Sequence, residues 1–333
     1  MKDKKEQMLE LLQDSRGFND PERWVDYGIS HNFVKVKIEN VEKCPDCLSN
    51  DFKFLGQFIY YSSLVKLQEC VQCGLVFSDT RIDPEIIHSH FQQAYKDESY
   101  FLQGRSRIFK QISNLTDKAA KQGARVLDIG GAKGHLLAMI KKSRADLSMV
   151  LNDLSEDACR HAESEYGFET VLGGIEDLEK ISEKFDVLIM SDVIYYEPEL
   201  RRLWNLLPRL VSESGTVIIR VPNKLHLIRL WLLTRNMMLS KGEREMQDNI
   251  KFLNPEHIFI FSQHYLLTRL KKLGFSHVAA LPSELLAEGQ GNVLRRLYYY
   301  ISKIISIITF GRLVITPSLL VIASNIVSRD NRS

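Results

Sequence analysis

The sequence lacks the features that would set it in a membrane or tie it to a polyanion. It contains no uninterrupted apolar run of about 18 residues, which is the length that a spanning helix needs. The nearest candidate, Leu297–Ile322, is broken by Lys303 and Arg312. No run of six like charges occurs, and the net charge is only +2. We therefore expect a globular protein with no nucleic-acid partner.

The first residues of the sequence do not predict a secretory signal. Residues Met1–Arg16 are charged and contain no apolar core segment, so they do not read as a signal peptide. We expect a cytoplasmic protein whose thiols stay reduced. Five cysteines in such a compartment favour metal ligands over disulfides.

Four of the cysteines form two C-x-x-C pairs. Cys44-Pro-Asp-Cys47 and Cys70-Val-Gln-Cys73 are separated by 22 residues, a spacing that can place four thiolates around one zinc ion. The alternative is four buried free thiols. Residues 41–80 hold five acidic and three basic side chains, which makes this module a poor phosphate binder. We predict a structural zinc site, because four protein ligands leave no open position for a substrate.

From residue 125 the sequence alternates between short β-rich runs and helical segments. The β-rich runs are 126–129, 149–152, 187–190 and 217–221. Alternation of this kind predicts parallel β-α-β units. The expected organisation is a helical extension over 1–40, the zinc module over 41–80, a helical linker over 81–122 and an α/β domain over 123–333, with an amphipathic insert over 287–315.

A glycine-rich turn follows the first of these strands. Val126–Ile129 runs into Gly130-Gly131-Ala132-Lys133-Gly134 and then into a helical stretch. Glycines let the backbone approach a ligand closely or adopt a positive φ, and the order strand, loop, helix puts that ligand at the carboxyl end of the sheet. Asp153 ends the next strand, where a carboxylate can accept hydrogen bonds from ribose hydroxyls. Glu176 or Asp177, after the third strand, could meet an adenine amine.

This series resembles the class I S-adenosylmethionine-dependent methyltransferases. Asp128–Gly134 matches their Asp/Glu-x-Gly-x-Gly-x-Gly motif except at Ala132, and Asp153-Leu154-Ser155 matches the acidic segment that follows. Phe185–Val193 and Ser214–Ile219 match the fourth and fifth strands. The alternative, a dehydrogenase, requires G-x-G-x-x-G, whose later glycines would fall on Ala132 and His135.

The resemblance implies a Rossmann-like, seven-stranded α/β sheet that is mostly parallel, has helices on both faces and ends in an antiparallel strand near 318–324. It implies an enzyme that uses S-adenosylmethionine. The cofactor-binding residues it implies are Asp128, Gly130, Gly131, Gly134, Asp153, Leu154, Glu176, Asp177 and Ser191.

Candidates for the acceptor side are fewer. His257 has a pKa suited to base catalysis and Glu256 could orient it, while Tyr195 follows the fourth strand, where acceptors meet the methyl group. The segment from Glu256 to Ser262 resembles part of bacterial sugar C-methyltransferases, which also carry an N-terminal zinc module but have a further large C-terminal domain. We expect a small-molecule or glycan acceptor, a sugar or glycan-pathway intermediate. The alternatives are an RNA methyltransferase and a non-catalytic cofactor-fold scaffold at a membrane.

Two segments are unusually apolar. Residues 225–239 contain few charges, and within 297–308 a helix would gather Leu297, Ile301, Ile304, Ile305 and Ile308 on one face. Such a face could contact the inner surface of a membrane peripherally. The preferred interpretation at this stage is a helix that packs on the core or on another subunit.

Overall fold

The computed structural model describes residues 25–29, 32–38, 41–60, 63–78, 80–82, 104–238, 259–286 and 293–326. The chain forms two compact units. The first combines residues 1–90 with 224–260, and the second combines residues 91–223 with 261–333.

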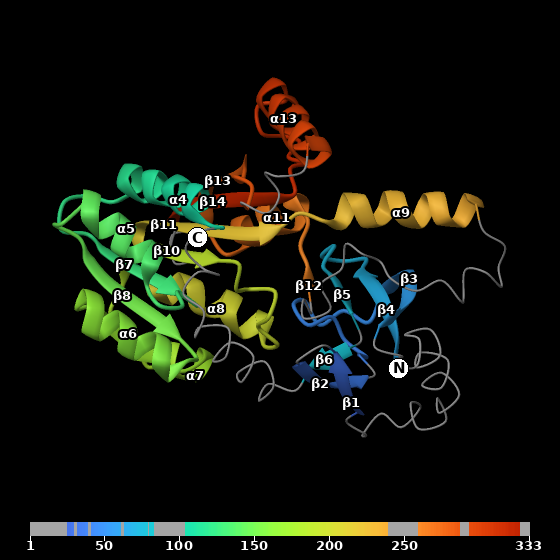
Figure 1. The fold of residues 1–333 in the computed structure, drawn as a ribbon, viewed down its shortest axis with the longest axis horizontal. Helices are drawn as coiled ribbons and strands as arrows, with labels where there is room; N and C mark the ends of the chain where they lie inside the picture. Colours follow the sequence, from blue (N-terminus) through green and yellow to red (C-terminus); the bar gives the residue numbers. More distant parts are fainter. Residues whose placement is uncertain are drawn as a thin grey trace, which may run out of the picture. The chain divides into compact units, whose positions relative to one another are not determined.

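The second unit is built on a seven-stranded sheet (Figure 1). Its strands are β7 (Arg125–Ile129), β8 (Ser148–Asp153), β9 (Glu169–Leu172), β10 (Phe185–Ser191), β11 (Val211–Pro222), β13 (Phe275–Pro282) and β14 (Ser318–Ile326). They lie in the order β13-β14-β11-β10-β7-β8-β9. The pairs from β9 to β11 are parallel, whereas β14 runs antiparallel to both β11 and β13. The predicted seven-stranded α/β sheet, mostly parallel with a final antiparallel strand, is confirmed.

Both faces of this sheet are covered. The helices α4 (Ser106–Ala119), α5 (His135–Ser143) and α6 (Glu156–Tyr166) share one apolar cluster with Val187 and Ile189 of β10. Alternate residues of a strand point to opposite faces, and Leu188 and Met190 are buried as completely as their neighbours. Two further helices, α8 (Leu200–Leu210) and α11 (Gln263–Lys272), are joined by a hydrogen bond in which Trp204 Nε1 donates to the Tyr265 hydroxyl at 2.9 Å.

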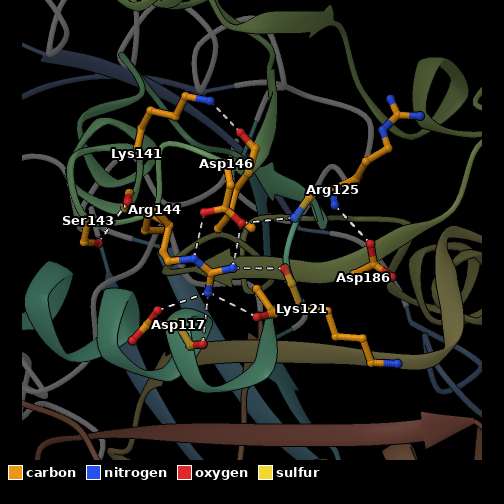
Figure 2. Close-up of polar contacts among 12 residues, drawn as sticks. Asp117, Lys121, Arg125, Lys141, Ser143, Arg144, Asp146 and Asp186 are labelled. Carbon is orange, nitrogen blue, oxygen red and sulfur yellow. Dashed lines mark hydrogen bonds and ion pairs between the residues drawn. The ribbon is translucent and has the colours of Figure 1, made fainter.

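The amino ends of the strands are fastened by Arg144, just after α5 (Figure 2). Its guanidinium donates to both carboxylate oxygens of Asp146 at 2.9 and 2.8 Å and to the carbonyls of Ala120 and Lys121 at 3.1 and 3.0 Å. Ala120 and Lys121 follow α4, so one side chain joins the end of α4 to the turn before β8. This network lies at the edge away from the glycine-rich turn, and we read it as structural.

The first unit contains two small antiparallel sheets. One has the order β1-β2-β6, formed by β1 (Val25–Ile29), β2 (Asn32–Ile38) and β6 (Thr80–Ile82). The other has the order β12-β5-β4-β3, formed by β3 (Phe52–Tyr60), β4 (Ser63–Cys70), β5 (Val76–Ser78) and β12 (Phe259–Ile260). Leu225, Ile228 and Leu232 of α9 (Leu225–Met238) form a small core with Leu67 and Val76.

The organisation differs from the sequence expectation in three places. The expected helical extension, 1–40, contains strands β1 and β2, and its residues 1–24 lie outside the described residues. The expected linker contributes α4, whose Ile108 and Ile112 are core residues. Residues 224–260 belong with the cysteine-bearing unit rather than with the α/β sheet, because the apolar side of α9 packs on β4 and β5.

The expected insert, 287–315, contains the helix α13 (Val293–Ile308). Across the ranges given above, no helix combines the length and the apolar character needed to cross a bilayer.

Candidate functional site

The glycine-rich turn joins β7 to α5 and has a backbone that most residues avoid. Gly130 and Gly134 have φ values of 68° and 80°, and Ala132 between them has φ 50°. A Cβ on Gly130 would lie 2.5 Å from Cγ2 of Val193, and one on Gly131 would lie 2.9 Å from Oδ2 of Asp128. The two positions therefore require glycine for space, and Gly130 also requires it for conformation. Ala132 occupies the position where the family motif has glycine, and it takes the left-handed conformation that glycine would favour.

Asp153 closes this turn from the neighbouring strand. Its Oδ2 accepts from the Ala132 N–H and its Oδ1 accepts from the Ser155 N–H, both at 2.9 Å. The carboxylate is 4% exposed. A carboxylate has about four lone-pair positions, so each of its oxygens can accept more than one hydrogen bond.

Asp128, the acidic residue of the turn motif, is buried beside Asp153. Burial, together with the charge of Asp153, raises the pKa of Asp128 from its ordinary 3.8 to about 8. The Asp128 carboxyl group is therefore mostly protonated at neutral pH until a positive charge arrives. A ligand that carries a cation, such as the ammonium of an amino acid, would favour its ionised form.

Asn152 ties the turn to the third strand. Its backbone carbonyl accepts from the N–H groups of Gly130 and Gly131 at 2.8 and 3.0 Å. Its side-chain amide donates to the carbonyls of Val171 and Gly173, both at 2.9 Å. One residue thus holds the glycine turn in register with the end of β9.

The predicted adenine side lies at the short helix α7 (Ile175–Leu178). The Glu176 carboxylate pairs with Arg202 at 2.8 Å and Asp177 pairs with Lys180 at 2.7 Å. Leu154 is 51% exposed, and its Cδ2 lies 3.5 Å from a Cβ built on Gly174. An exposed leucine beside a glycine forms a flat apolar surface next to Asp153, whereas both acids already have cationic partners.

A buried ion cluster stands at the carboxyl end of β10. Asp192, with φ 61°, pairs with Arg220 of β11 and with Arg105 at 3.1 Å. Arg220 also donates through Nε to the Ser283 hydroxyl at 2.8 Å. Two guanidinium groups contact one carboxylate here, at the edge where the glycine turn lies.

Three polar residues, Ser191, Tyr195 and Glu197, lie at or just after the carboxyl end of β10. The Ser191 hydroxyl is buried without a hydrogen-bond partner. Burial, with the charge of Asp192, raises the pKa of Tyr195 well above 10, so its phenol stays protonated and can donate but not act as a base. Burial also raises the pKa of the Glu197 carboxyl group.

The four predicted cysteine ligands meet in the first unit. Their Sγ atoms all lie within 4.8 Å of one another, with Cys44 to Cys73 at 3.6 Å and Cys47 to Cys70 at 3.4 Å. Each pair is followed by a residue with positive φ, Leu48 at 63° and Gly74 at 75°. The Leu48 N–H donates to the carbonyl of Cys44, and the Gly74 N–H donates to that of Cys70. The two C-x-x-C pairs therefore form turns with the same backbone hydrogen bond, and their thiols meet in one cluster.

The structure gathers Asp128, Asp153 and Ser191 with the turn glycines at one sheet edge, as the sequence predicted. His257 and Glu256 lie outside the described residues. Sequence reasoning missed four polar residues of this edge: Arg105, Asn152, Arg220 and Ser283. For Asn152, Arg220 and Ser283 the sequence signal was a polar residue at or near the end of a strand. For Arg105 there was no such signal in the sequence.

Several solved structures of low sequence identity match about 70% of this chain. A chain in the Haloferax volcanii complex of the Trm112 methyltransferase activator and a methyltransferase is 14% identical, with 71% of this chain and 98% of that chain covered and a TM-score of 0.49. A methyltransferase from Archaeoglobus fulgidus is 19% identical, with 68% and 100% covered and a TM-score of 0.43. One from Thermotoga maritima is 14% identical, with 72% and 99% covered and a TM-score of 0.45. Comparison with curated protein sequences gives no match.

A family model identifies the chain directly. The model described as a methyltransferase domain matches residues 100–280, more than half of the 333 residues. The match contains the glycine turn, Asp153 and the ion cluster of Asp192. The chain therefore belongs to the methyltransferase-domain family and is an S-adenosylmethionine-dependent methyltransferase.

Proposed function

We propose that this enzyme transfers a methyl group from S-adenosylmethionine to a sugar or glycan-pathway intermediate that carries an anionic group. The observation that supports this most is the cluster of Arg105, Asp192 and Arg220 at the carboxyl edge of the sheet. Arginine binds phosphate and carboxylate groups with two parallel hydrogen bonds, so the arginines at this edge would bind an anionic group of the acceptor. A nucleotide-linked sugar has such a group together with many hydroxyls.

The cofactor assignments rest on the glycine turn. When bound, S-adenosylmethionine supplies a methyl group on a positively charged sulfur. Asp153 would accept from the ribose hydroxyls, Leu154 would lie against the adenine, and Gly130, Gly131 and Gly134 would let the backbone come close. Asp128 would face the amino-acid end, where a positive charge would lower its raised pKa. The orphaned Ser191 hydroxyl fits a ligand that supplies its partner. The carboxylate of Glu176 or Asp177 could accept from the adenine amine only while it also stays paired with its present cation, Arg202 or Lys180.

The acceptor must be aligned with the methyl group and lose a proton. The Tyr195 hydroxyl would donate a hydrogen bond to an oxygen of the methyl-accepting molecule, because its phenol stays protonated. We retain His257, oriented by Glu256, as the proposed base. An acceptor held by Arg105 would keep its hydroxyls over the same sheet edge.

For the cysteine cluster we propose a structural zinc ion. Four sulfurs bound to zinc at the usual distance of about 2.3 Å lie about 3.8 Å apart in a tetrahedron, and the two contacts of 3.4 and 3.6 Å are close to that spacing. The ligands would be Cys44, Cys47, Cys70 and Cys73. They would leave no site for an acceptor, so the metal would stabilise its unit and take no part in methyl transfer.

The test is transfer of a labelled methyl group to a panel of nucleotide-linked sugars and to total RNA. We expect label in a nucleotide sugar and none in RNA. Arg105→Gln should raise the KM for the anionic acceptor about tenfold or more while leaving the affinity for S-adenosylhomocysteine unchanged. Arg107→Gln is the matched control, because Arg107 is an exposed arginine on the same segment.

Asp153→Ala separates failure of the cofactor site from failure of the acceptor assignment. It should abolish S-adenosylhomocysteine binding in calorimetry. Label in RNA, or an unchanged KM in Arg105→Gln, would overturn the acceptor class but leave the enzyme class intact.

A further inference from the structure

The helix α13 has its apolar side turned away from the protein. Its buried residues are Tyr299, Ser302 and Ser306, all at most 3% exposed. The exposed apolar residues are Val293, Leu294, Leu297, Tyr300, Ile301, Ile304, Ile307 and Ile308, which are between 48% and 76% exposed. An ordinary surface helix buries its apolar stripe and exposes its polar one. In α13 the two sides are reversed.

The attachment of α13 is specific on the polar side. Lys303 Nζ donates to Glu284 Oε1 at 3.0 Å and lies over the Tyr299 ring, and the Tyr298 hydroxyl donates to the carbonyl of Ile315. The two buried serines are small enough for a close approach. The orientation of the helix is therefore fixed by contacts, and the exposed apolar side follows from it.

The turn after α13 presents a further aromatic side chain. Phe310 is 91% exposed and has φ 51°, a conformation that is costly for a bulky residue. Gln263 holds the turn, since its Nε2 donates to the Gly311 carbonyl at 2.8 Å and its Oε1 accepts from the Val314 N–H at 2.9 Å. The turn holds Phe310 in a strained backbone conformation with its side chain in solvent, which is typical of a residue that binds a partner.

Charge distinguishes the kinds of partner. Residues 293–313 contain Arg295, Arg296, Lys303 and Arg312 and no aspartate or glutamate. Lys303 is paired with Glu284. The side chains of Arg295, Arg296 and Arg312 are exposed to solvent. A second copy of this chain docked face to face would bring like charges together. Apolar side chains flanked by arginines match the acyl and headgroup layers of an anionic bilayer.

The position of α13 in its own unit bears on its use. Since β13 and β11 are both antiparallel to β14, β13 ends at the same sheet edge as the glycine turn. Ser283 and Glu284 follow β13, and they contact Arg220 and Lys303 respectively. Figure 1 shows α13 outside the layered core of its unit. The helix thus lies beside the edge that holds the proposed acceptor site.

We propose that α13 and the turn at Phe310 form a peripheral anchor that lies in the interface of an anionic lipid bilayer. The apolar side chains enter the acyl boundary, and Arg295, Arg296 and Arg312 contact the headgroups. The anchor sets the acceptor edge of the sheet against the membrane. This inference goes beyond the proposed function and does not depend on the identity of the acceptor.

The test is flotation of the full-length protein with vesicles. Phosphatidylcholine vesicles that contain phosphatidylglycerol should carry the wild type upward, and vesicles of phosphatidylcholine alone should carry much less. The double variant Ile304→Asn/Ile308→Asn should lower the partition coefficient about tenfold or more. Arg295→Gln/Arg296→Gln should lower binding only to the vesicles with phosphatidylglycerol. The control is Phe54→Asn, at a 58% exposed residue of β3, which should bind as the wild type does.

Two results would overturn the proposal. One is a wild type that stays at the bottom of the gradient with both vesicles. The other is a wild-type oligomer, seen by light scattering, that Ile304→Asn/Ile308→Asn converts to monomer, which would make this face an interface between copies. Binding of S-adenosylhomocysteine at wild-type affinity checks that each variant is folded. That readout also separates failure of the anchor from failure of the enzyme assignment.

Discussion

Asp128 and Asp153 place two carboxyl groups under one glycine turn, and the two have different surroundings. Asp153 accepts two backbone hydrogen bonds at 2.9 Å. Asp128 is 2% exposed and its pKa is raised to about 8. Hydrogen bonds to a carboxylate favour its charged form, whereas burial favours the neutral form. The Asp128 carboxyl group therefore stays mostly protonated at neutral pH.

This difference predicts a pH dependence of stability. Between about pH 4 and about pH 8 folded Asp128 keeps a proton that the unfolded chain has released, so the free energy of unfolding falls as pH rises through that range. Asp128→Asn removes this dependence. At about pH 4 the variant and the wild type should have nearly the same free energy of unfolding. Above about pH 8 the free energy of unfolding of the variant should be higher by up to about 5 kcal/mol.

Urea unfolding at several pH values measures this difference. Asp157→Asn, at an exposed acid of α6, should follow the wild type throughout. Parallel curves for wild type and Asp128→Asn would contradict a raised pKa for Asp128.

At the scale of the element, α6 shows how one residue serves both a helix and the proposed site. The Ser155 hydroxyl accepts from the Ala158 N–H at 3.3 Å and caps the helix, while the Ser155 N–H donates to Asp153. The cap uses the side chain and the site uses the backbone. A substitution can therefore remove the first without the second.

Ser155→Ala should lower stability by about 1 kcal/mol, the usual effect of losing an N-cap. The affinity for S-adenosylhomocysteine should remain, because alanine keeps the N–H that binds Asp153. Thermal unfolding and calorimetry give the two values. Ser164→Ala, at an exposed serine of the same helix, should leave both unchanged, and a loss of affinity in Ser155→Ala would show that the cap also positions Asp153.

At the scale of the whole molecule, the proposed metal and the proposed chemistry fall in different units. All four clustered cysteines belong to the first unit, and the glycine turn and ion cluster belong to the second. Cys159, the remaining cysteine, is buried in the core of the second unit. Removal of a structural metal should therefore act on one unit first.

We expect one zinc ion per chain by native mass spectrometry, retained in Cys159→Ser and lost in Cys70→Ser. In calorimetric melting, EDTA should lower one transition, that of the first unit, and leave a transition that S-adenosylhomocysteine still raises. A freshly purified protein without zinc would contradict the metal assignment. If EDTA lowered both melting transitions equally, the expectation that the metal stabilises only the first unit would be wrong.

The sequence by itself determined what depends on short-range order. The alternation of strands and helices, the glycine turn at Gly130–Gly134 and the two C-x-x-C pairs were all predicted from neighbouring residues. Backbone conformation and capping are local, so their signals lie within a few positions of one another.

Only the tertiary structure decided which distant residues meet. Residues 224–260 join the cysteine-bearing unit although they interrupt the α/β sheet in sequence, and Arg105 and Arg220 converge on Asp192 from separate elements. The apolar stripe of α13 was visible in sequence, but its outward direction was not. Periodicity shows which residues share a side of a helix, whereas the partner of that side is set by packing between segments far apart in the chain.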